Sequence, residues 1–314
     1  MNTPDLPADL EIAVLIPCYN EEAAIGDVVH NFKSALPTAT IYVYDNNSSD
    51  RTIDVAREAG AVVRNESLQG KGNVVRRMFA DIDADVFVMT DGDNTYDAGS
   101  APGMIAKLLN ESLDLVNGKR VHKATEAYRP GHQFGNALLT SLVATIFGKR
   151  FDDMLSGLKV FSRRYVKSFP SLSSGFEIET ELTVHALELR MPVAEMETPY
   201  GARPEGSESK LSTYSDGFRI LKTIANLIKE ERPLQFFLAL FGLCAIASIG
   251  LAIPLVLTYL EIGAVPRMPT AVLVTGMMLL AFLFLACGLI LDTVTRGRQE
   301  FKRLQYLSVN QKRA

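Results

Sequence analysis

The sequence IAVLIPCYNEE occupies residues 12–22 and joins a short apolar run to a polar turn. The apolar residues 12–16 are followed by Pro17, which is typical of a buried strand that ends there. From residue 21 to residue 36 the apolar side chains recur at helical spacing. The stretch therefore predicts a strand followed directly by a helix, which is the first unit of an α/β fold.

The alternation of strand and helix continues along the next hundred residues. We expect strands at 41–44, 61–64, 86–90 and 114–117, and helices at 52–59, 72–80 and 102–109. Such repeats form a Rossmann-like, mostly parallel sheet with helices on both faces, and they bind ligands beyond the carboxyl ends of the strands. The polar residues at those ends are therefore candidates for a site, namely 19–21, 45–50, 91–93 and 118–120.

After residue 120 the pattern loosens into a loop rich in His, Arg, Pro and Gly. Beyond it we expect an apolar helix at about 136–147, a helix at 178–190, a strand at 193–199 and a loop at 201–210. Residues 211–232 carry one apolar stripe at helical spacing, which favours an amphipathic helix in the membrane interface. A surface helix packed on the core is the alternative.

Two segments near the C-terminus contain no side chain that is charged at neutral pH, the 27 residues 234–260 and the 22 residues 270–291. Each exceeds the roughly 20 residues that a helix needs to cross a bilayer, so together they predict a transmembrane hairpin. Basic residues flank its open end, whereas its tip carries one, Arg267. This bias places the chain termini in the cytosol. Two buried helices of a soluble core are the alternative.

Charge divides the chain in the same way. The first 233 residues carry a net charge of −8 and the remainder +4. The acidic part argues against nucleic acid as a partner, and the two spans exclude a purely soluble enzyme and a multi-span channel. The first ten residues contain no basic side chain, so no secretory signal is expected. We expect a globular domain at 1–210, an amphipathic helix at 211–233, the hairpin at 234–292 and a basic tail at 293–314.

Asp91-Gly92-Asp93 directly follows one of the expected strands. Two carboxylates one residue apart can bind a hard divalent cation, which in turn bridges the phosphates of a nucleotide. Asp45 closes another strand, and Lys71 lies in a Gly-Lys-Gly loop that allows close approach to a phosphate. An acidic turn with a purely structural role is the alternative.

Six motifs follow one another in order along the chain. They are IPCYNEE at 16–22, YDNNSSDRT at 44–52, GKG at 70–72, DGD at 91–93, GKR at 118–120 and SGLKVFSRR at 156–164. Together they resemble the family 2 inverting glycosyltransferases, and more narrowly the polyprenyl-phosphate glycosyltransferases, which include dolichol-phosphate mannose synthases and bacterial undecaprenyl-phosphate glucosyltransferases. The resemblance implies a GT-A fold and transfer of a hexose, with glucose or N-acetylglucosamine favoured, from a nucleotide-diphosphate sugar to a polyprenyl phosphate. The product would serve cell-surface glycan assembly or modification.

Carried over position by position, the resemblance implies a nucleotide site, a metal site and a phosphate site. The nucleotide, UDP by preference, would meet Asp91 together with Pro17, Tyr19, Glu21, Asp45 and Lys71. Asp91 and Asp93 would bind Mg²⁺ or Mn²⁺ and, with Arg120, form the catalytic centre. The donor diphosphate and the acceptor phosphate would meet Arg129, His132, Arg203, Ser209 and Lys210.

Three positions depart from the pattern of the family. Asn46 is second in a motif that is usually Asp-Asp, Thr95 stands where some relatives have a metal-binding Gln, and His132 stands where relatives often have Arg. Structural roles compete with several assignments: Arg120 could cap the sheet edge, and Arg203 and Lys210 could be solvated loop charges. The acids at 177, 179 and 181 precede a helix whose dipole explains them, and we do not assign them to catalysis.

The acceptor distinguishes the remaining functions. A phosphate monoester has a second pKa near ~6 and needs no strong base, whereas extension of a lipid-diphosphate-linked glycan needs one, for which Asp153 is the candidate. A processive polysaccharide synthase is excluded because its Q-x-x-R-W motif needs a tryptophan and the chain has none. A membrane scaffold without activity is disfavoured because Asp91 and Asp93 are intact. The resemblance implies a multi-pass protein of the inner (cytoplasmic) membrane and allows a homo-oligomer.

Overall fold

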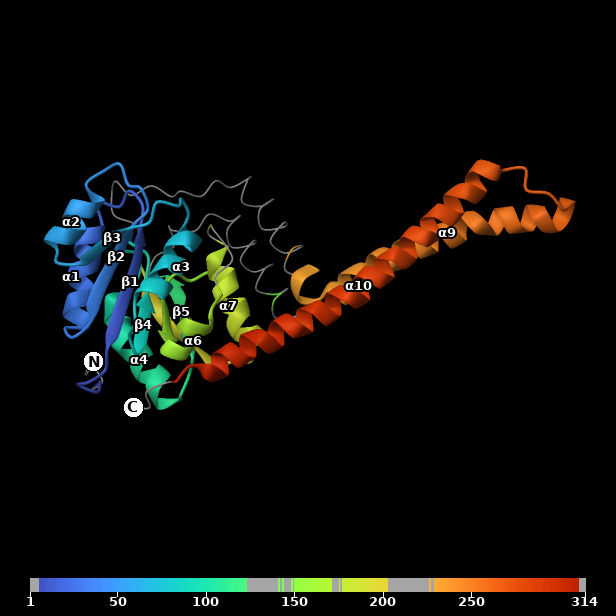
Figure 1. Cartoon of the computed structure of the whole chain (residues 1–314). Helices are drawn as coiled ribbons and strands as arrows, with labels where there is room; N and C mark the ends of the chain where they lie inside the picture. Colours follow the sequence, from blue (N-terminus) through green and yellow to red (C-terminus); the bar gives the residue numbers. More distant parts are fainter. Residues whose placement is uncertain are drawn as a thin grey trace. The chain divides into compact units, whose positions relative to one another are not determined.

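A computed structural model describes residues 6–122, 150–170, 177–202 and 229–310 of the chain, together with the single positions 141, 143, 148, 175 and 226. The chain divides into two compact units. The first comprises residues 1–220 together with 302–314, and the second comprises residues 221–301. Each unit is described by itself below (Figure 1).

The first unit is built on a seven-stranded sheet of order β3-β2-β1-β4-β6-β5-β7. All neighbouring strands are parallel except β6, which runs antiparallel to both β4 and β5. The predicted mostly parallel sheet is therefore confirmed. The strands are β1 Ile12–Cys18, β2 Thr40–Asp45, β3 Val62–Asn65, β4 Val86–Met89, β5 Leu115–His122, β6 Lys159–Ser162 and β7 Val193–Tyr200.

Helices cover both faces of this sheet (Figure 1). They are α1 Ile25–Ala35, α2 Thr52–Glu58, α3 Lys71–Asp81, the short 3₁₀ turn η1 Ala98–Ser100, α4 Ala101–Asn110, α6 Arg163–Ser168 and α7 Ile178–Glu188. Alternate residues of β1 pack with α1 and α4 in one apolar cluster. On the other face, Phe79 of α3 lies edge-on to Phe161 and Phe169. Because both faces are covered, β1 and β4 are fully buried, which explains their unbroken apolar sequence.

The order of the strands reverses between β1 and β4. The chain runs from β1 outward through β2 and β3, and then returns to β4 on the other side of β1. Parallel pairing from Ile12 with Val86 to Leu15 with Met89 brings the carboxyl ends of both strands to one edge. In open α/β sheets such a reversal is where ligands bind, so the residues after Cys18 and Met89 lie at the expected place.

Two features of the sheet differ from the prediction. No strand was predicted for β6 and no helix for α6, because these segments are short and β6 has only two apolar residues, which is too few to show a periodicity. In addition, β5 does not end at residue 117 but continues to His122, since it pairs with β7 over eight positions. Lys119 and Arg120 therefore lie within a strand and not in the turn beyond it. The predicted helix at 136–147, the loop at 201–210 and the amphipathic helix at 211–232 fall almost entirely outside the described residues.

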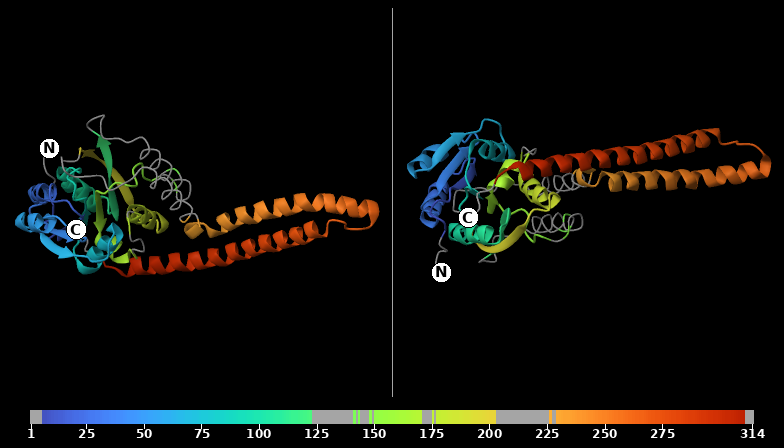
Figure 2. Two further views of the ribbon diagram at one scale, coloured as in Figure 1. Left: turned by 90° about the horizontal axis from the view of Figure 1, so that it is seen from above. Right: turned by 60° about the horizontal axis from the view of Figure 1, so that its bottom comes forward.

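The second unit contains a helical hairpin formed by α9 Pro233–Ile262 and α10 Met268–Ser308 (Figure 2). The Ser248 hydroxyl donates to the carbonyl of Val274 at 2.9 Å, and the rings of Phe237 and Phe284 lie 6.3 Å apart. Both helices are long and apolar enough to cross a membrane, and each contains an 18-residue window with a mean hydropathy of 2.5. The prediction of two long apolar helices is confirmed, and α10 continues as a helix through most of the segment predicted as a tail.

The last turns of α10 belong to the first unit, where they pack on its globular domain. The Lys302 ammonium pairs with Glu188 of α7 at 2.6 Å. The Tyr306 hydroxyl donates at 2.7 Å to Asp114, a fully buried carboxylate that also accepts two hydrogen bonds from Arg164. Both buried carboxylates are thus paired, as the cost of burying a charge requires.

Candidate functional site

Asp91 and Asp93 follow β4 at the edge where the strand order reverses. Asp93 is almost fully buried, and its Oδ1 accepts hydrogen bonds from the Thr95 hydroxyl at 2.6 Å and the Thr95 backbone N–H at 3.3 Å. The Asp91 side chain is more open, at 30% exposure. Thr95 therefore orients the carboxylate of Asp93.

Lys71 joins Asp91 to a second acidic residue, Glu179. Its ammonium lies 2.5 Å from Asp91 Oδ1 and also contacts Glu179 Oε1 in the first turn of α7. Burial alone would lower the pKa of Lys71, but the two carboxylates outweigh that effect and raise the pKa above its ordinary value. Lys71 is therefore charged, and it links the DGD turn to α7, whose Glu179 lies 108 positions after Lys71 along the chain.

The donor atoms at this edge fit a hard divalent cation. Asp91 and Asp93 offer carboxylate oxygens, the ligand type that Mg²⁺ and Mn²⁺ prefer. Asp91 already has a positively charged partner, the Lys71 ammonium. Within the described part of the chain no cluster of three or more His, Cys, Asp or Glu could hold a metal ion. Two protein ligands suit a cation whose remaining positions are filled by phosphate oxygens and water.

Two loops meet beside Lys71 and are tied together by Asn46. Its amide nitrogen donates to the carbonyls of Glu66 and Leu68 at 2.9 and 2.8 Å, and its Oδ1 accepts the N–H of Gly70 at 2.7 Å. Gly70 has φ of +128°, a conformation that a side chain disfavours. The asparagine in the second position of the motif thus fixes the loop that begins α3, and with it the backbone of Lys71.

Asp45 ends β2 with one of its carboxylate oxygens partnered and the other not. Oδ2 accepts the backbone N–H of Ser48 at 3.0 Å. Oδ1 is buried and has no hydrogen-bond partner among the residues that the structure describes. A buried carboxylate oxygen without a donor is costly, so this atom is an acceptor available to a ligand.

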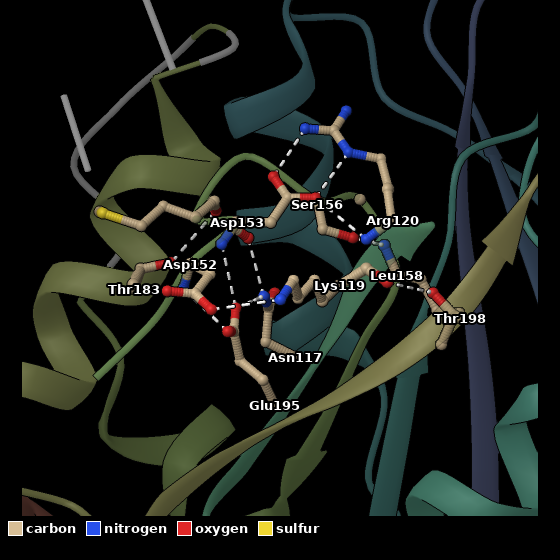
Figure 3. A network of polar contacts seen from close by, with 12 residues as sticks. Asn117, Lys119, Arg120, Asp152, Asp153, Ser156, Leu158, Thr183, Glu195 and Thr198 are labelled. Carbon is tan, nitrogen blue, oxygen red and sulfur yellow. Dashed lines mark hydrogen bonds and ion pairs between the residues drawn. The ribbon is translucent and has the colours of Figure 1, made fainter. Parts of the chain in front are cut away.

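Arg120 and Asp153 form a largely buried, bidentate ion pair (Figure 3). Arg120 Nε and Nη2 each donate to the carboxylate of Asp153 at 2.7 Å, and the Arg120 backbone N–H donates to it at 3.2 Å. Burial raises the pKa of Asp153, but the hydrogen bonds and charge of Arg120 outweigh burial and hold the pKa below its ordinary value. Asp153 is therefore a weak base in this arrangement.

A layer of polar side chains beneath this pair holds the segment that carries Asp153 (Figure 3). Glu195 of β7 accepts the backbone N–H groups of Asp152 and Asp153 at 2.8 and 3.1 Å. It also accepts the amide of Asn117 at 2.9 Å. The fully buried Lys159 donates to Asn117 Oδ1 at 2.5 Å, and burial lowers the pKa of this lysine to about 8. Three strands thus fix the position of Asp153 through its backbone.

Two tyrosines connect the Arg120 pair to the DGD turn. The Arg120 guanidinium lies 5.6 Å from the ring centre of Tyr200, which packs edge-on against Tyr96. The Tyr96 hydroxyl accepts the N–H of Gly157 at 2.6 Å. A Cβ atom on Gly157 would lie 2.4 Å from Asp91 Oδ2, so the SGLKV segment packs directly on that carboxylate. The two charged clusters therefore belong to one continuous site.

The structure brings together most of the predicted site residues that it describes. Pro17 lies within β1 opposite Tyr44, and Tyr19 and Glu21 follow at the edge; the Tyr19 side chain is 38% exposed. Asp45, Lys71, Asp91, Asp93 and Arg120 share this end of the sheet. The remaining predicted residues, Arg129, His132, Arg203, Ser209 and Lys210, lie outside the described residues and stay predictions.

Sequence reasoning missed two partners of these groups. Glu179 was set aside as a helix-dipole residue, although its carboxylate pairs with Lys71. Glu195 was not considered, although it binds the segment that carries Asp153. Alternation along β7 is the only sequence signal for Glu195, because it places the side chain on one face of a strand.

Comparison with known proteins agrees with this geometry. The profile of the family Glycosyl transferase family 2 matches residues 13–168. Glycosyltransferase AglJ of Haloferax volcanii is 32% identical over 320 residues, which cover 98% of this chain and 100% of that protein. The chain belongs to glycosyl transferase family 2. It is therefore a glycosyltransferase, as its six motifs predicted.

Other proteins resemble the chain over shorter stretches. The dolichyl-phosphate hexose transferase of Haloferax volcanii is 29% identical, over 71% of this chain and 96% of that protein. Protein RfbJ of Shigella flexneri is 57% identical over 39% of this chain and 95% of its own length. The glucosyl-3-phosphoglycerate synthase of Mycobacterium tuberculosis, solved with Mn²⁺ and UDP, superposes with a TM-score of 0.57 at 24% identity, over 71% of this chain and 80% of its own. That likeness shows a shared GT-A fold.

Proposed function

We propose that this glycosyltransferase moves a hexose from a nucleoside-diphosphate sugar to a polyprenyl phosphate, with inversion at the anomeric carbon. The observation that carries the choice of acceptor is the state of Asp153. Its carboxylate is occupied by Arg120 and its pKa is lowered, so it is poorly suited to take a proton from a hydroxyl. A phosphate monoester, largely a dianion above its second pKa of ~6, needs no base.

The two long apolar helices support a lipid as the carrier of that phosphate. Helices of this length and hydropathy suit a membrane, and a polyprenyl chain stays within the bilayer. The basic flanks of the hairpin favour a cytosolic catalytic domain at the inner membrane. The naming of one relative as a dolichyl-phosphate hexose transferase points the same way.

The donor would be a uridine-diphosphate sugar. The uracil ring presents an N–H on the edge where cytosine presents only an acceptor, and the unpartnered Oδ1 of Asp45 is an acceptor for such a group. UDP is also the nucleotide in the solved structure of the mycobacterial synthase. Glucose and N-acetylglucosamine are the first sugars to test.

In the proposed reaction one phosphate oxygen of the acceptor attacks the anomeric carbon from the face opposite the departing diphosphate. A carbon–oxygen bond forms to the lipid phosphate while the bond to the nucleoside diphosphate breaks, so an α-linked donor gives a β-linked product. Asp91 and Asp93 would hold Mg²⁺ or Mn²⁺, which supplies charge neutralisation for the diphosphate. Arg120 would provide fixed N–H donors for the acceptor phosphate, and the Lys71 ammonium beside Asp91 would add a positive charge for the diphosphate.

The experiment offers purified protein in detergent a panel of nucleotide sugars with undecaprenyl phosphate, with and without Mn²⁺, and identifies the lipid product by mass. Undecaprenol and an undecaprenyl-diphosphate-linked sugar serve as alternative acceptors. Of the three acceptors, we expect only undecaprenyl phosphate to give a product, and we expect no product from the Asp93→Asn variant. Transfer to a hydroxyl of the diphosphate-linked glycan, or no transfer from any donor, would overturn the proposal.

A further inference from the structure

The Lys71 ammonium is paired with two carboxylates, which a lysine that only binds phosphate would not require. The ammonium is not directed into open space but is held between Asp91 and Glu179, and the Lys71 side chain is only 10% exposed. The Glu179 side chain is similarly enclosed, at 12% exposure. Removing these charges from water is costly, and the cost is offset only while each charge keeps an opposite partner. The lysine and the two carboxylates therefore form one ion-paired cluster, in which a single ammonium serves both acids.

The backbone of Lys71 is fixed while its side chain is long enough to move. Asn46 holds the preceding Gly70, and Lys71 begins α3. The four-carbon side chain of a lysine has rotatable bonds that let its ammonium change partners without a change in the helix. Glu179 sits in the first turn of α7, on a separate element from Asp91. The ammonium can thus leave Asp91 and keep Glu179.

A divalent cation and the Lys71 ammonium compete for Asp91. The ammonium lies 2.5 Å from Oδ1, and two cations this close to one oxygen repel each other strongly at the low dielectric of a partly buried site. We propose that the Lys71 ammonium takes the place of the metal ion beside Asp91 until the metal binds. This inference rests on the proposed metal-binding role of Asp91. The ammonium neutralises Asp91 in the empty enzyme, yields that carboxylate when the metal and the donor diphosphate bind, and is retained in the site by Glu179.

This exchange couples metal and nucleotide. Without nucleotide, the metal gains Asp91 at the expense of the Lys71 contact, so metal alone binds weakly. With a nucleoside diphosphate present, the released ammonium gains phosphate oxygens as new partners. Metal and diphosphate therefore strengthen each other's binding by the same factor, as linkage requires. Glu179 is a positioning residue that acts through Lys71.

The test measures direct Mn²⁺ binding by the full-length protein in detergent, without lipid acceptor, by counting free Mn²⁺ with electron paramagnetic resonance. We expect Lys71→Met to bind Mn²⁺ alone about 3- to 10-fold more tightly than the wild type, because the competing contact is lost. Glu179→Gln should bind it several-fold more weakly, because Lys71 then stays on Asp91. Adding UDP should tighten Mn²⁺ binding much more in the wild type than in Lys71→Met.

The double variant Lys71→Met/Glu179→Gln separates exchange from a general change of charge. If Glu179 acts through Lys71, Glu179→Gln changes Mn²⁺ affinity by less than about 2-fold once Lys71 is gone. Additive effects of the two substitutions would overturn the proposal, as would unchanged Mn²⁺ affinity in Lys71→Met. Lys107→Met is the matched control, because Lys107 pairs with Glu111 on the surface of α4. It should leave Mn²⁺ affinity unchanged.

Two further outcomes remain decisive. If Lys71→Met does not fold, Glu179→Gln alone provides the answer, and a wild-type Mn²⁺ affinity in that variant would reject the exchange. The lipid plays no part in these measurements. A protein that shows the exchange but transfers sugar to another acceptor would refute the proposed function and leave this inference standing, whereas absence of Mn²⁺ binding by the wild type would refute the inference.

Discussion

The Arg120 side chain donates two hydrogen bonds of 2.7 Å to the carboxylate of Asp153. Arg120 lies on β5, which continues beyond the end that the sequence predicted. The pairing fixes the charge state of both groups, since each stabilises the ionised form of the other. It also leaves part of the Arg120 guanidinium free of Asp153, because a guanidinium carries five N–H donors. Arg120 can thus stay paired and still meet an anionic substrate.

The pH dependence of transfer should report the acceptor and not Asp153. Because the pKa of Asp153 is lowered, this carboxylate stays ionised across the working range and adds no acid limb above pH 5. We expect kcat/KM for the lipid phosphate to rise about tenfold between pH 5 and pH 7, following its second pKa of ~6. A phosphonate acceptor, with a higher second pKa, should move this limb upward. An identical limb with both acceptors would assign it to the protein instead.

Glu195→Gln should lower the rate of transfer to the lipid phosphate without changing the binding of the nucleotide sugar. Glutamine keeps one acceptor oxygen, but its NH₂ cannot accept the N–H group that the other carboxylate oxygen binds, so the segment loses a charged hydrogen bond worth about 1.5–3 kcal/mol. We expect kcat/KM for the acceptor to fall on the order of tenfold, with the Kd of UDP and Mn²⁺ unchanged. Glu197→Gln, on the same strand with a 71% exposed side chain, is the control and should behave as wild type.

Local sequence patterns predicted the half of the site that depends on strand ends. Asp91 and Asp93 follow an apolar run, and the parallel sheet alone brings that run beside β1. The other half depends on contacts between distant segments. Glu179 meets Lys71 across 108 positions, and its place at a helix start offered a sufficient local explanation. Arg120 reaches Asp153 only because β7 extends β5, which its own composition did not indicate.

Gly157→Ala should damage the metal site more than the fold. The new methyl group would lie 2.4 Å from Asp91 Oδ2, so the carboxylate must move, and overpacking of this kind costs about 1–3 kcal/mol. We expect Mn²⁺ affinity to fall by about tenfold or more, measured by direct titration. Gly103→Ala on α4, whose methyl would lie 3.6 Å from Met196, should keep the Mn²⁺ affinity of the wild type with an equal or higher Tm. Normal Mn²⁺ binding by Gly157→Ala would contradict the close packing described above.

Asn46→Ala should destabilise the protein and weaken nucleotide binding together. Removal of the amide leaves one N–H and two carbonyl groups without a hydrogen-bond partner in the loop before α3. The free energy of unfolding should therefore fall by about 2 kcal/mol or more. The Kd for UDP should rise, because Lys71 loses its fixed backbone. Asn47→Gly is the control. Asn47 is exposed with φ of +66°, which glycine adopts readily, so its loss should cost less than half as much.

His185 should make the protein sensitive to acid. It is buried in α7 against Tyr165 and Phe169, and burial, with a smaller effect of Lys302, lowers its pKa to about 3. Between about pH 6.5 and pH 3 the unfolded chain binds a proton that the folded chain does not. Stability therefore falls with pH in this window, by up to about 1.4 kcal/mol per unit from this group.

The variant His185→Gln removes that titration. Unfolding followed by circular dichroism at pH 7, 6 and 5 should show a shallower loss of stability in His185→Gln than in the wild type, even if the variant is less stable at pH 7. His30→Gln is the matched control. His30 is exposed on α1, and the described contact of its ring is with the backbone carbonyl of Gly26 in the same helix. Its stability should decline with pH as steeply as that of the wild type. Equal slopes in all three proteins would show that the folded domain protonates His185 without penalty.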